Sequence, residues 1–279
     1  APALAVTPAE AAAPPLKLAL LVSSRPDQCY DNGDVAAVTA LARREQDRIN
    51  RLGGIAGRRI ELSLLDDKSE SALTTANIQS ALGDPDTLAI VGLSSSNRAK
   101  AAFEALGKDI RDSGIPFLSH ISVGSIFEAY PNVYSTQSSQ DDERLPVMAQ
   151  FIRHMRLDRV AFVGLSDAVF STNLGDGLRR RLVQDALVAD RRLKTVDDTL
   201  DAAEVAATVA ELKEKSPQVV VLGIGGKRAG VLLQALVAQQ VTPALFVAGR
   251  IESLPPELVN TYPNALYQLA WDRLPEADD

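Results

Sequence analysis

The chain has few of the residues on which metal and redox chemistry depend. It contains one cysteine, Cys29, and two histidines among 279 residues. One cysteine cannot form an internal disulfide, and a zinc site would need more histidine and cysteine ligands. His154 follows Arg153 in a helical stretch, where we expect a solvated surface role. We therefore predict no metal and no cofactor.

Aromatic side chains and long apolar runs are also scarce. Aromatic residues make up 5% of the chain, the formal net charge is −7, and Lys and Arg are scattered. These features argue against a nucleic-acid partner, which needs basic stripes or stacking platforms. No apolar run approaches the roughly 20 residues of a membrane span, so we expect none in this chain.

The N-terminal stretch, residues 1–15, is rich in alanine and proline. It lacks the basic start and apolar core of an intact signal peptide. We expect it to be the flexible lead of a processed, exported protein.

The most informative stretch of the chain begins at Leu88–Val91, which is apolar throughout, as is typical of a parallel strand buried on both faces. Gly92 permits a turn, and Ser94, Ser95 and Ser96 stand where a helix begins. Ligands of open α/β sheets bind beyond the carboxyl ends of strands, at helix N-termini. The three hydroxyls therefore either cap the helix or line a ligand site.

Strand and helix patterns alternate on both sides of a break near residue 137. The first set predicts strands at 16–22, 58–65, 88–91, 115–119 and 132–137, and helices at 34–52, 71–82 and 97–112. The second predicts strands at 159–165, 192–196, 218–223, 244–248 and 265–271, and helices at 173–188, 202–215 and 227–240. Ser138 and Ser139, followed by acidic residues, mark a helix start at the crossing. The chain is thus α/β, with two Rossmann-like lobes at 16–136 and 137–279.

Three motifs invite an enzymatic interpretation. The turn Gly223–Gly226 lacks both the G-x-G-x-x-G dinucleotide spacing and the P-loop order. Asp66 and Asp67 are adjacent, so on a strand they point to opposite faces and make poor partners for one reaction. His120 lies between serines, but no G-x-S-x-G elbow accompanies it. We predict no catalytic residues, although an α/β enzyme remains an alternative.

The segment Asn50–Leu62, with Gly53-Gly54-Ile55-Ala56-Gly57-Arg58, resembles the signature of type I periplasmic solute-binding proteins. The likeness includes Asp66-Asp67 and continues through 89–96, 114–119, 134–137 and 160–163. The most similar branch contains the leucine/isoleucine/valine-binding proteins of ABC transporters. The resemblance covers about residues 16–271.

This resemblance implies two α/β lobes with parallel central sheets, joined by a hinge that closes over a small ligand. It implies a periplasmic protein that delivers its ligand to an ABC permease. A ligand-sensing domain of a membrane receptor is the alternative. Members usually continue after the last strand and cross back into lobe one. We expect that return segment to be missing here, because the chain is a fragment, a reduced form or a sensor followed by a membrane helix.

The resemblance also implies the binding residues. In lobe one the ligand carboxylate would meet the third and fourth strand ends, at Ser94, Ser95, Ser96, Ser119, His120, Ile121 and Ser122. The family's threonine position falls on Val123, so the carboxylate clamp is only partly kept. Tyr30 and Phe170 fall near aromatic cleft walls, and Arg228 would approach from lobe two.

Arg250 stands near the place where the family has an acidic residue for the ligand's ammonium group. A positive charge there repels an ammonium and attracts a carboxylate. We therefore hypothesise that the ligand is an anion or a neutral molecule rather than a branched-chain amino acid. A surface arginine at a strand end is the alternative interpretation.

Overall fold

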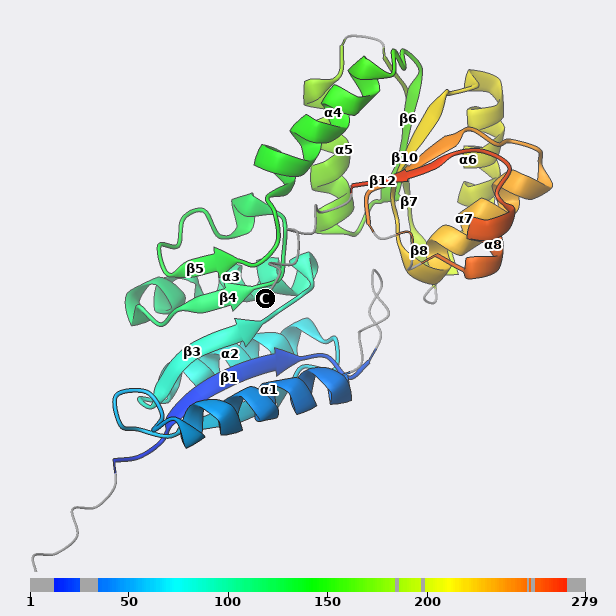
Figure 1. Ribbon diagram of the computed structural model, residues 1–279. Helices are drawn as coiled ribbons and strands as arrows, with labels where there is room; N and C mark the ends of the chain where they lie inside the picture. Colours follow the sequence, from blue (N-terminus) through cyan, green and yellow to red (C-terminus); the bar gives the residue numbers. More distant parts are fainter. Residues whose placement is uncertain are drawn as a thin grey trace, which may run out of the picture.

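The computed structural model describes residues 13–25, 35–183, 186–196, 199–249, 251 and 254–269. They form two parallel five-stranded sheets, each with helices on its faces, and the two sheets belong to separate lobes (Figure 1). The predicted two-lobe α/β fold is therefore confirmed.

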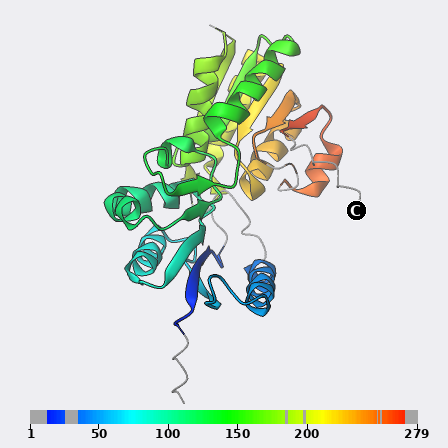
Figure 2. The ribbon, with the colours of Figure 1, turned by 60° about the vertical axis from the view of Figure 1, so that its left-hand side comes forward.

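The first lobe has the strand order β2-β1-β3-β4-β5. Helices α2 and α3 cover one face of this sheet and α1 lies on the other, as right-handed crossovers require (Figure 2). Its elements are β1 (Leu16–Val22), α1 (Val35–Arg51), β2 (Ile60–Asp66), α2 (Ser71–Gly83), β3 (Thr87–Gly92), α3 (Ser96–Ser113), β4 (Phe117–Ser119), a 3-10 turn (Gly124–Ile126) and β5 (Val133–Ser135).

The core of the first lobe lies between the sheet and helices α2 and α3. Phe103 of α3 makes edge-on contacts with Phe117 and Tyr130, at centroid distances of 5.5 and 5.0 Å. Helix α1, in contrast, contains no buried residue. The buried core of this lobe therefore lies on the side of the sheet that α2 and α3 cover.

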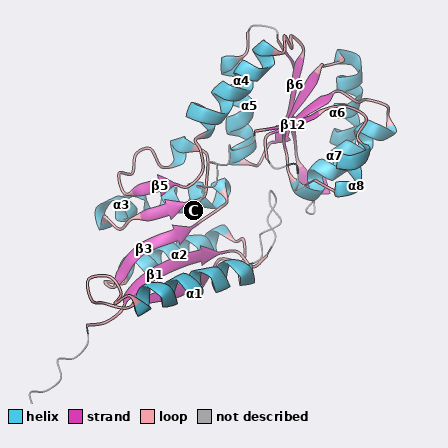
Figure 3. Ribbon diagram, viewed as in Figure 1, coloured by secondary structure: helices cyan, strands magenta, loops and turns pink. Residues whose placement is uncertain are grey.

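The second lobe has the strand order β12-β11-β10-β6-β7 (Figure 3). Every residue of β6 and β10 is buried, as expected for central strands covered on both faces. Its elements are a π-turn (Gln140–Arg144), α4 (Leu145–His154), β6 (Val160–Leu165), α5 (Val169–Arg181), β7 (Leu187–Leu193), β8 (Thr195–Val196), β9 (Thr199–Leu200), α6 (Ala202–Lys215), β10 (Val219–Gly223), α7 (Gly226–Ala238), β11 (Ala244–Val247), α8 (Pro256–Thr261) and β12 (Leu266–Gln268).

Two predicted elements are wrong. Helix α5 ends at Arg181 rather than at 188, and the strand predicted at 192–196 is instead β7, at Leu187–Leu193. Two charged residues of β7, Asp190 and Arg192, form an ion pair at 3.1 Å, so the strand carries charges that are typical of a helix surface. Pairing with β6 along the whole strand overrides the local preference. The short helix α8 and the β8–β9 pair were not predicted.

The predicted helix start after residue 137 is present. The hydroxyl of Ser139 accepts a hydrogen bond from the Asp142 amide at 3.2 Å. Three acidic residues follow in this first turn, where the helix dipole favours them. The chain therefore enters the second lobe through a capped turn.

The side chain of Phe162, a residue of β6, is fully buried in the core of the second lobe and faces helix α5. Three glycines make room for the ring, because a Cβ at Gly164, Gly175 or Gly223 would lie 2.5 to 3.0 Å from ring atoms. The backbone of three elements thus closes around one aromatic side chain.

Replacing Phe162 by alanine should lower the free energy of unfolding by about 3–5 kcal/mol, because the rigid surroundings cannot fill the cavity. Urea unfolding followed by circular dichroism measures the loss. Val147→Ala, on the exposed side of α4 in the same lobe, is the matched control and should cost about 0.5 kcal/mol or less. Equal losses in the two variants would contradict this packing argument.

Candidate functional site

A cavity of about 280 Å³ opens at the carboxyl ends of β1, β3 and β4. Parallel strands end at the same edge of a sheet, so residues from distant parts of the sequence meet there. The lining residues are Leu21, Val22, Ser23, Val35, Val38, Asp67, Gly92, Leu93, Ser94 and His120.

The turn between β3 and α3 shapes one wall of this cavity. Gly92 has a φ of 114°, and a side chain there would collide with the carbonyl oxygen of Leu21. Ser95 occupies the N-cap position of α3, yet its side chain makes no capping hydrogen bond. Ser94 is exposed and lines the cavity, whereas Ser96 is buried. The Ser95 side chain therefore does not cap the helix, which was one of the two interpretations of these hydroxyls.

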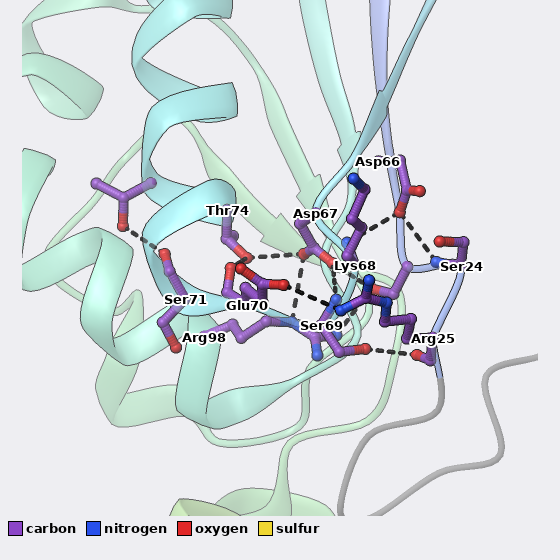
Figure 4. A network of polar contacts seen from close by, with 12 residues as sticks. Ser24, Arg25, Asp66, Asp67, Lys68, Ser69, Glu70, Ser71, Thr74 and Arg98 are labelled. Atoms are coloured by element: carbon purple, nitrogen blue, oxygen red, sulfur yellow. Dashed lines mark hydrogen bonds and ion pairs between the residues drawn. The ribbon is translucent and has the colours of Figure 1, made fainter.

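A buried ion pair joins the strand ends beneath the cavity (Figure 4). Arg98 Nε lies 3.3 Å from Asp67 Oδ2, and the two side chains are only 4% and 2% exposed. Asp67 also accepts hydrogen bonds from the Ser23 and Thr74 hydroxyls, both at 2.7 Å, and from the Ser69 amide at 2.8 Å. Arg98 donates to the Ser23 hydroxyl at 3.0 Å. The network therefore ties β1, α2 and α3 to the end of β2.

The neighbouring Asp66 turns the other way, as predicted for adjacent carboxylates. It accepts hydrogen bonds from the Ser24 and Lys68 amides, both at 2.9 Å. Partial burial opposes ionisation of Asp66, but the hydrogen bonds from Ser24 and Lys68 outweigh it and lower the pKa of this carboxyl. The two carboxylates thus have different hydrogen-bond partners and do not act as a pair.

His120 follows β4 and lines the same cavity. Its Nδ1 lies 2.8 Å from the Thr136 hydroxyl, which in turn donates to the Ser119 carbonyl at 3.1 Å. We assign the hydrogen of the His120–Thr136 contact to Nδ1 of His120, since the single Thr136 proton can then bond to the Ser119 carbonyl. Burial, and then the positive charge of Arg144, lower the pKa of the imidazole. His120 is therefore neutral at pH 7.

The other predicted residues of this loop lie beneath the surface. Ser119, Ile121 and Ser122 are at most 2% exposed, and none of them lines the cavity. The Ser122 carbonyl accepts a hydrogen bond from the Gln140 amide at 2.7 Å. The loop thus leads into the crossing to lobe two, with His120 at its surface.

Two of the residues predicted from lobe two, Phe170 and Arg228, do not line this cavity. Phe170 packs partly buried against the second-lobe core, and its carbonyl accepts from Gln140 Nε2 at 3.3 Å. Arg228 is 4% exposed in the first turn of α7. Tyr30 and Arg250 lie outside the described residues.

One side chain near the cavity bridges the lobes directly. Asn97, in the first turn of α3, donates from Nδ2 to the Asp167 carbonyl at 2.8 Å and accepts at Oδ1 from the Val169 amide at 2.7 Å. The Val169 amide belongs to the first turn of α5, whose early N–H groups have no partner within the helix. Asn97 therefore caps a helix of the other lobe.

Sequence reasoning did not predict roles for Asn97 and Arg98. One signal for Arg98 was available, since it lies four and eight positions before Ala102 and Leu106 on the buried stripe of α3. A charged residue on such a stripe needs a buried partner. For Asn97 no local signal exists, because its partners belong to the other lobe.

Over the described ranges, no group of three or more His, Cys, Asp or Glu side chains could hold a metal ion. Within the same ranges, no helix is long and apolar enough to cross a bilayer.

The sequence profile of the periplasmic binding protein family matches residues 32–262, and the chain belongs to this family. The resemblance noted from the sequence is thereby confirmed. A search of curated protein sequences finds no significant match.

Three solved structures with the same fold illustrate how distant in sequence such neighbours can be. The type 1 periplasmic binding protein from Bordetella pertussis Tohama I has 18% identity and a TM-score of 0.67, over 84% of this chain and 62% of that one. The leucine-binding protein from Thermotoga maritima has 15% identity and a TM-score of 0.65, over 88% and 66%. A solute-binding protein of an ABC transporter from Rhodopseudomonas palustris, solved with 3,4-dihydroxybenzoic acid, has 14% identity and a TM-score of 0.64, over 86% and 65%. This chain thus spans less than two thirds of the length of these structures, and the likeness shows the fold alone.

Arg98→Met should lower the free energy of unfolding by about 3–5 kcal/mol, because it leaves the Asp67 charge buried without its partner. The double variant Asp67→Asn/Arg98→Met should lose less than the sum of the single variants. Urea unfolding of the four proteins measures this coupling. Glu70→Gln, which breaks the exposed pair between Arg25 and Glu70, should change stability little. Additive losses at Asp67 and Arg98 would argue against a coupled pair.

Proposed function

We propose that this protein captures a small solute between its two lobes by hinge closure and delivers it to an ABC-type permease in the periplasm. The observation that carries the proposal is the cavity where β1, β3 and β4 end, beside the contact of Asn97 with lobe two. In a hinged two-lobe fold such a cavity is covered when the lobes approach. The family membership supports solute binding without catalysis.

We propose that the lobes comprise residues 16–136 and 137–279, with the hinge at the capped turn after Ser139. The strands of the first sheet end at Ser135, and those of the second begin at Val160. Gln140 stands at this turn and contacts both sides, through the Ser122 and Phe170 carbonyls. This sheet membership and these contacts support the division.

The ligand contacts that we propose are narrower than the predicted set. Ser94 and His120 present side chains to the cavity, while Ser119, Ile121 and Ser122 support the loop from beneath. Ser95 and Ser96 shape the start of α3 and would contribute main-chain N–H groups, because the first N–H groups of a helix have no partner within it. Phe170, Arg228, Arg250 and Tyr30 remain proposed contacts of the closed state.

We further propose that the ligand is not a branched-chain α-amino acid. Among the described residues that line the cavity, Asp67 alone is acidic, and Arg98 already neutralises it. A ligand ammonium group would therefore find no unbalanced carboxylate among these described lining residues. The Rhodopseudomonas palustris neighbour, solved with 3,4-dihydroxybenzoic acid, is a precedent for a ligand of another class on this fold.

A thermal-shift screen against amino acids, organic acids, sugars, phenols and polyamines tests solute binding, because a ligand of the native state raises the melting temperature. We expect a hit outside the amino acids. For that hit, Ser94→Ala should weaken binding by about 2- to 13-fold in calorimetric titration, the effect of one lost hydrogen bond. Ser125→Ala, in the exposed 3-10 turn of the same lobe, is the matched control. A best hit among branched-chain amino acids would overturn the proposed ligand preference.

A further inference from the structure

The polar groups at the floor of the cavity already form hydrogen bonds and an ion pair with one another. The two carboxylate oxygens of Asp67 together accept hydrogen bonds from Ser23, Ser69 and Thr74, and Asp67 forms an ion pair with Arg98. The Ser23 hydroxyl donates its one proton to Asp67 and accepts from Arg98. These groups therefore present neither net charge nor a spare proton to a ligand.

Unlike the polar groups of the floor, His120 has a ring nitrogen, Nε2, that is available to a ligand. In the assigned tautomer its Nδ1–H is directed to the Thr136 hydroxyl, which donates to the Ser119 carbonyl. In the neutral ring, Nε2 is then a hydrogen-bond acceptor without a proton. Arg144 is the charged group that acts on this ring, and the charge of Asp67 across the cavity is balanced by Arg98. His120 can thus accept a proton-bearing group and cannot donate to an anion from Nε2.

The rest of the wall is apolar. Leu21, Val22, Leu93, Val35 and Val38 contribute aliphatic side chains from β1, the β3–α3 turn and α1. An apolar cavity of about 150 Å³ is enough to hold benzene. The volume here, about 280 Å³, therefore suits one substituted ring or a branched chain of similar size.

We propose that this cavity selects a compact apolar solute that bears an uncharged hydroxyl group, an alcohol or a phenol, which donates its hydrogen bond to Nε2 of His120. Ser94 is exposed and lines the same cavity, and its hydroxyl is the proposed donor to the oxygen of this group. This inference rests on the proposed solute-binding function and names the chemical class of its ligand.

The test compares probes of one shape in calorimetric titrations of the full chain at pH 7.5. The probes are 4-methylphenol, 4-methylanisole, 4-methylbenzoate and 4-methylbenzylamine, with L-leucine as the amino acid. We expect 4-methylphenol to bind best and at least about fivefold more tightly than 4-methylanisole, which has no proton to donate. An equal affinity for the phenol and its methyl ether would overturn the proposal.

The pH dependence gives a readout that packing alone would not produce. Since the pKa of His120 lies below its usual range, affinity for 4-methylphenol should be constant above pH 7 and fall as the pH drops through that pKa. The protonated ring donates from Nε2, so 4-methylbenzoate should gain affinity over the same range. The pKa of His120 is measured on the same protein by NMR titration, and a phenol affinity that does not change as the pH falls through that pKa would contradict the assigned role of Nε2.

Variants separate the hydrogen bond from the fold. His120→Leu should lose the preference for 4-methylphenol over 4-methylanisole, and His120→Gln, which keeps an acceptor oxygen, should retain part of it. His154→Leu, at an exposed position in α4 of the other lobe, is the matched control. An unchanged melting temperature without ligand shows that each variant is folded.

The outcomes separate a failure of this inference from a failure of the proposed solute-binding function on which it rests. If the carboxylate, the amine or L-leucine binds and the phenol does not, solute binding stands and the hydroxyl preference fails. If no probe in this panel or in the broader thermal-shift screen binds, both fail.

Discussion

The ion pair between Asp67 and Arg98 is the constraint on which the candidate site depends. Removing two charges from water is costly, so a buried pair contributes little to stability by itself. Its importance here is geometric, because the carboxylate is held by groups from the β1 end, the turn after β2, helix α2 and helix α3. Losing either charge would leave the other stranded in the protein interior. The position of the β3–α3 turn, and of Ser94 upon it, is thereby fixed relative to the sheet.

The same pair determines the electrical character of the site. A cavity with an unbalanced carboxylate would attract cations, and one with a free guanidinium would attract anions. Here the two cancel, and the neutral His120 adds no charge. Recognition at this wall must therefore depend on shape, apolar contact and directional hydrogen bonds. Such a wall discriminates between ligands that form its hydrogen bond and ligands that cannot, rather than between ligands of different charge.

Much of the fold could be predicted from local sequence signals. The helix at 202–215 has the predicted limits, because Asp201 caps it through the amides of Ala203 and Glu204. Continuous apolar runs identified the central strands β6 and β10. Strand β7 was not predicted because its charged residues Asp190 and Arg192 find partners, Arg179 and Asp176, on helix α5, which packs beside it only in the folded lobe.

The candidate site was only partly predictable for a similar reason. Ser94 and His120 follow predicted strands, so their place at the sheet edge could be inferred. The burial of Ser119 and Ser122 depends on how the loop folds back toward the crossing, and no period in the sequence reports it. The interaction of Asp67 with Arg98 joins residues that are 31 positions apart, and neither residue alone identifies the other.

Asn97 has a consequence for how such a protein can diversify. Its amide contacts only main-chain atoms of the other lobe, the Asp167 carbonyl and the Val169 amide. Every amino acid except proline offers the same two groups, so substitutions at these positions leave the bridge intact. The side chains around the start of α5 are thus free to change under selection while the two halves keep their alignment. A single amide side chain thereby separates the evolution of ligand preference from the maintenance of architecture.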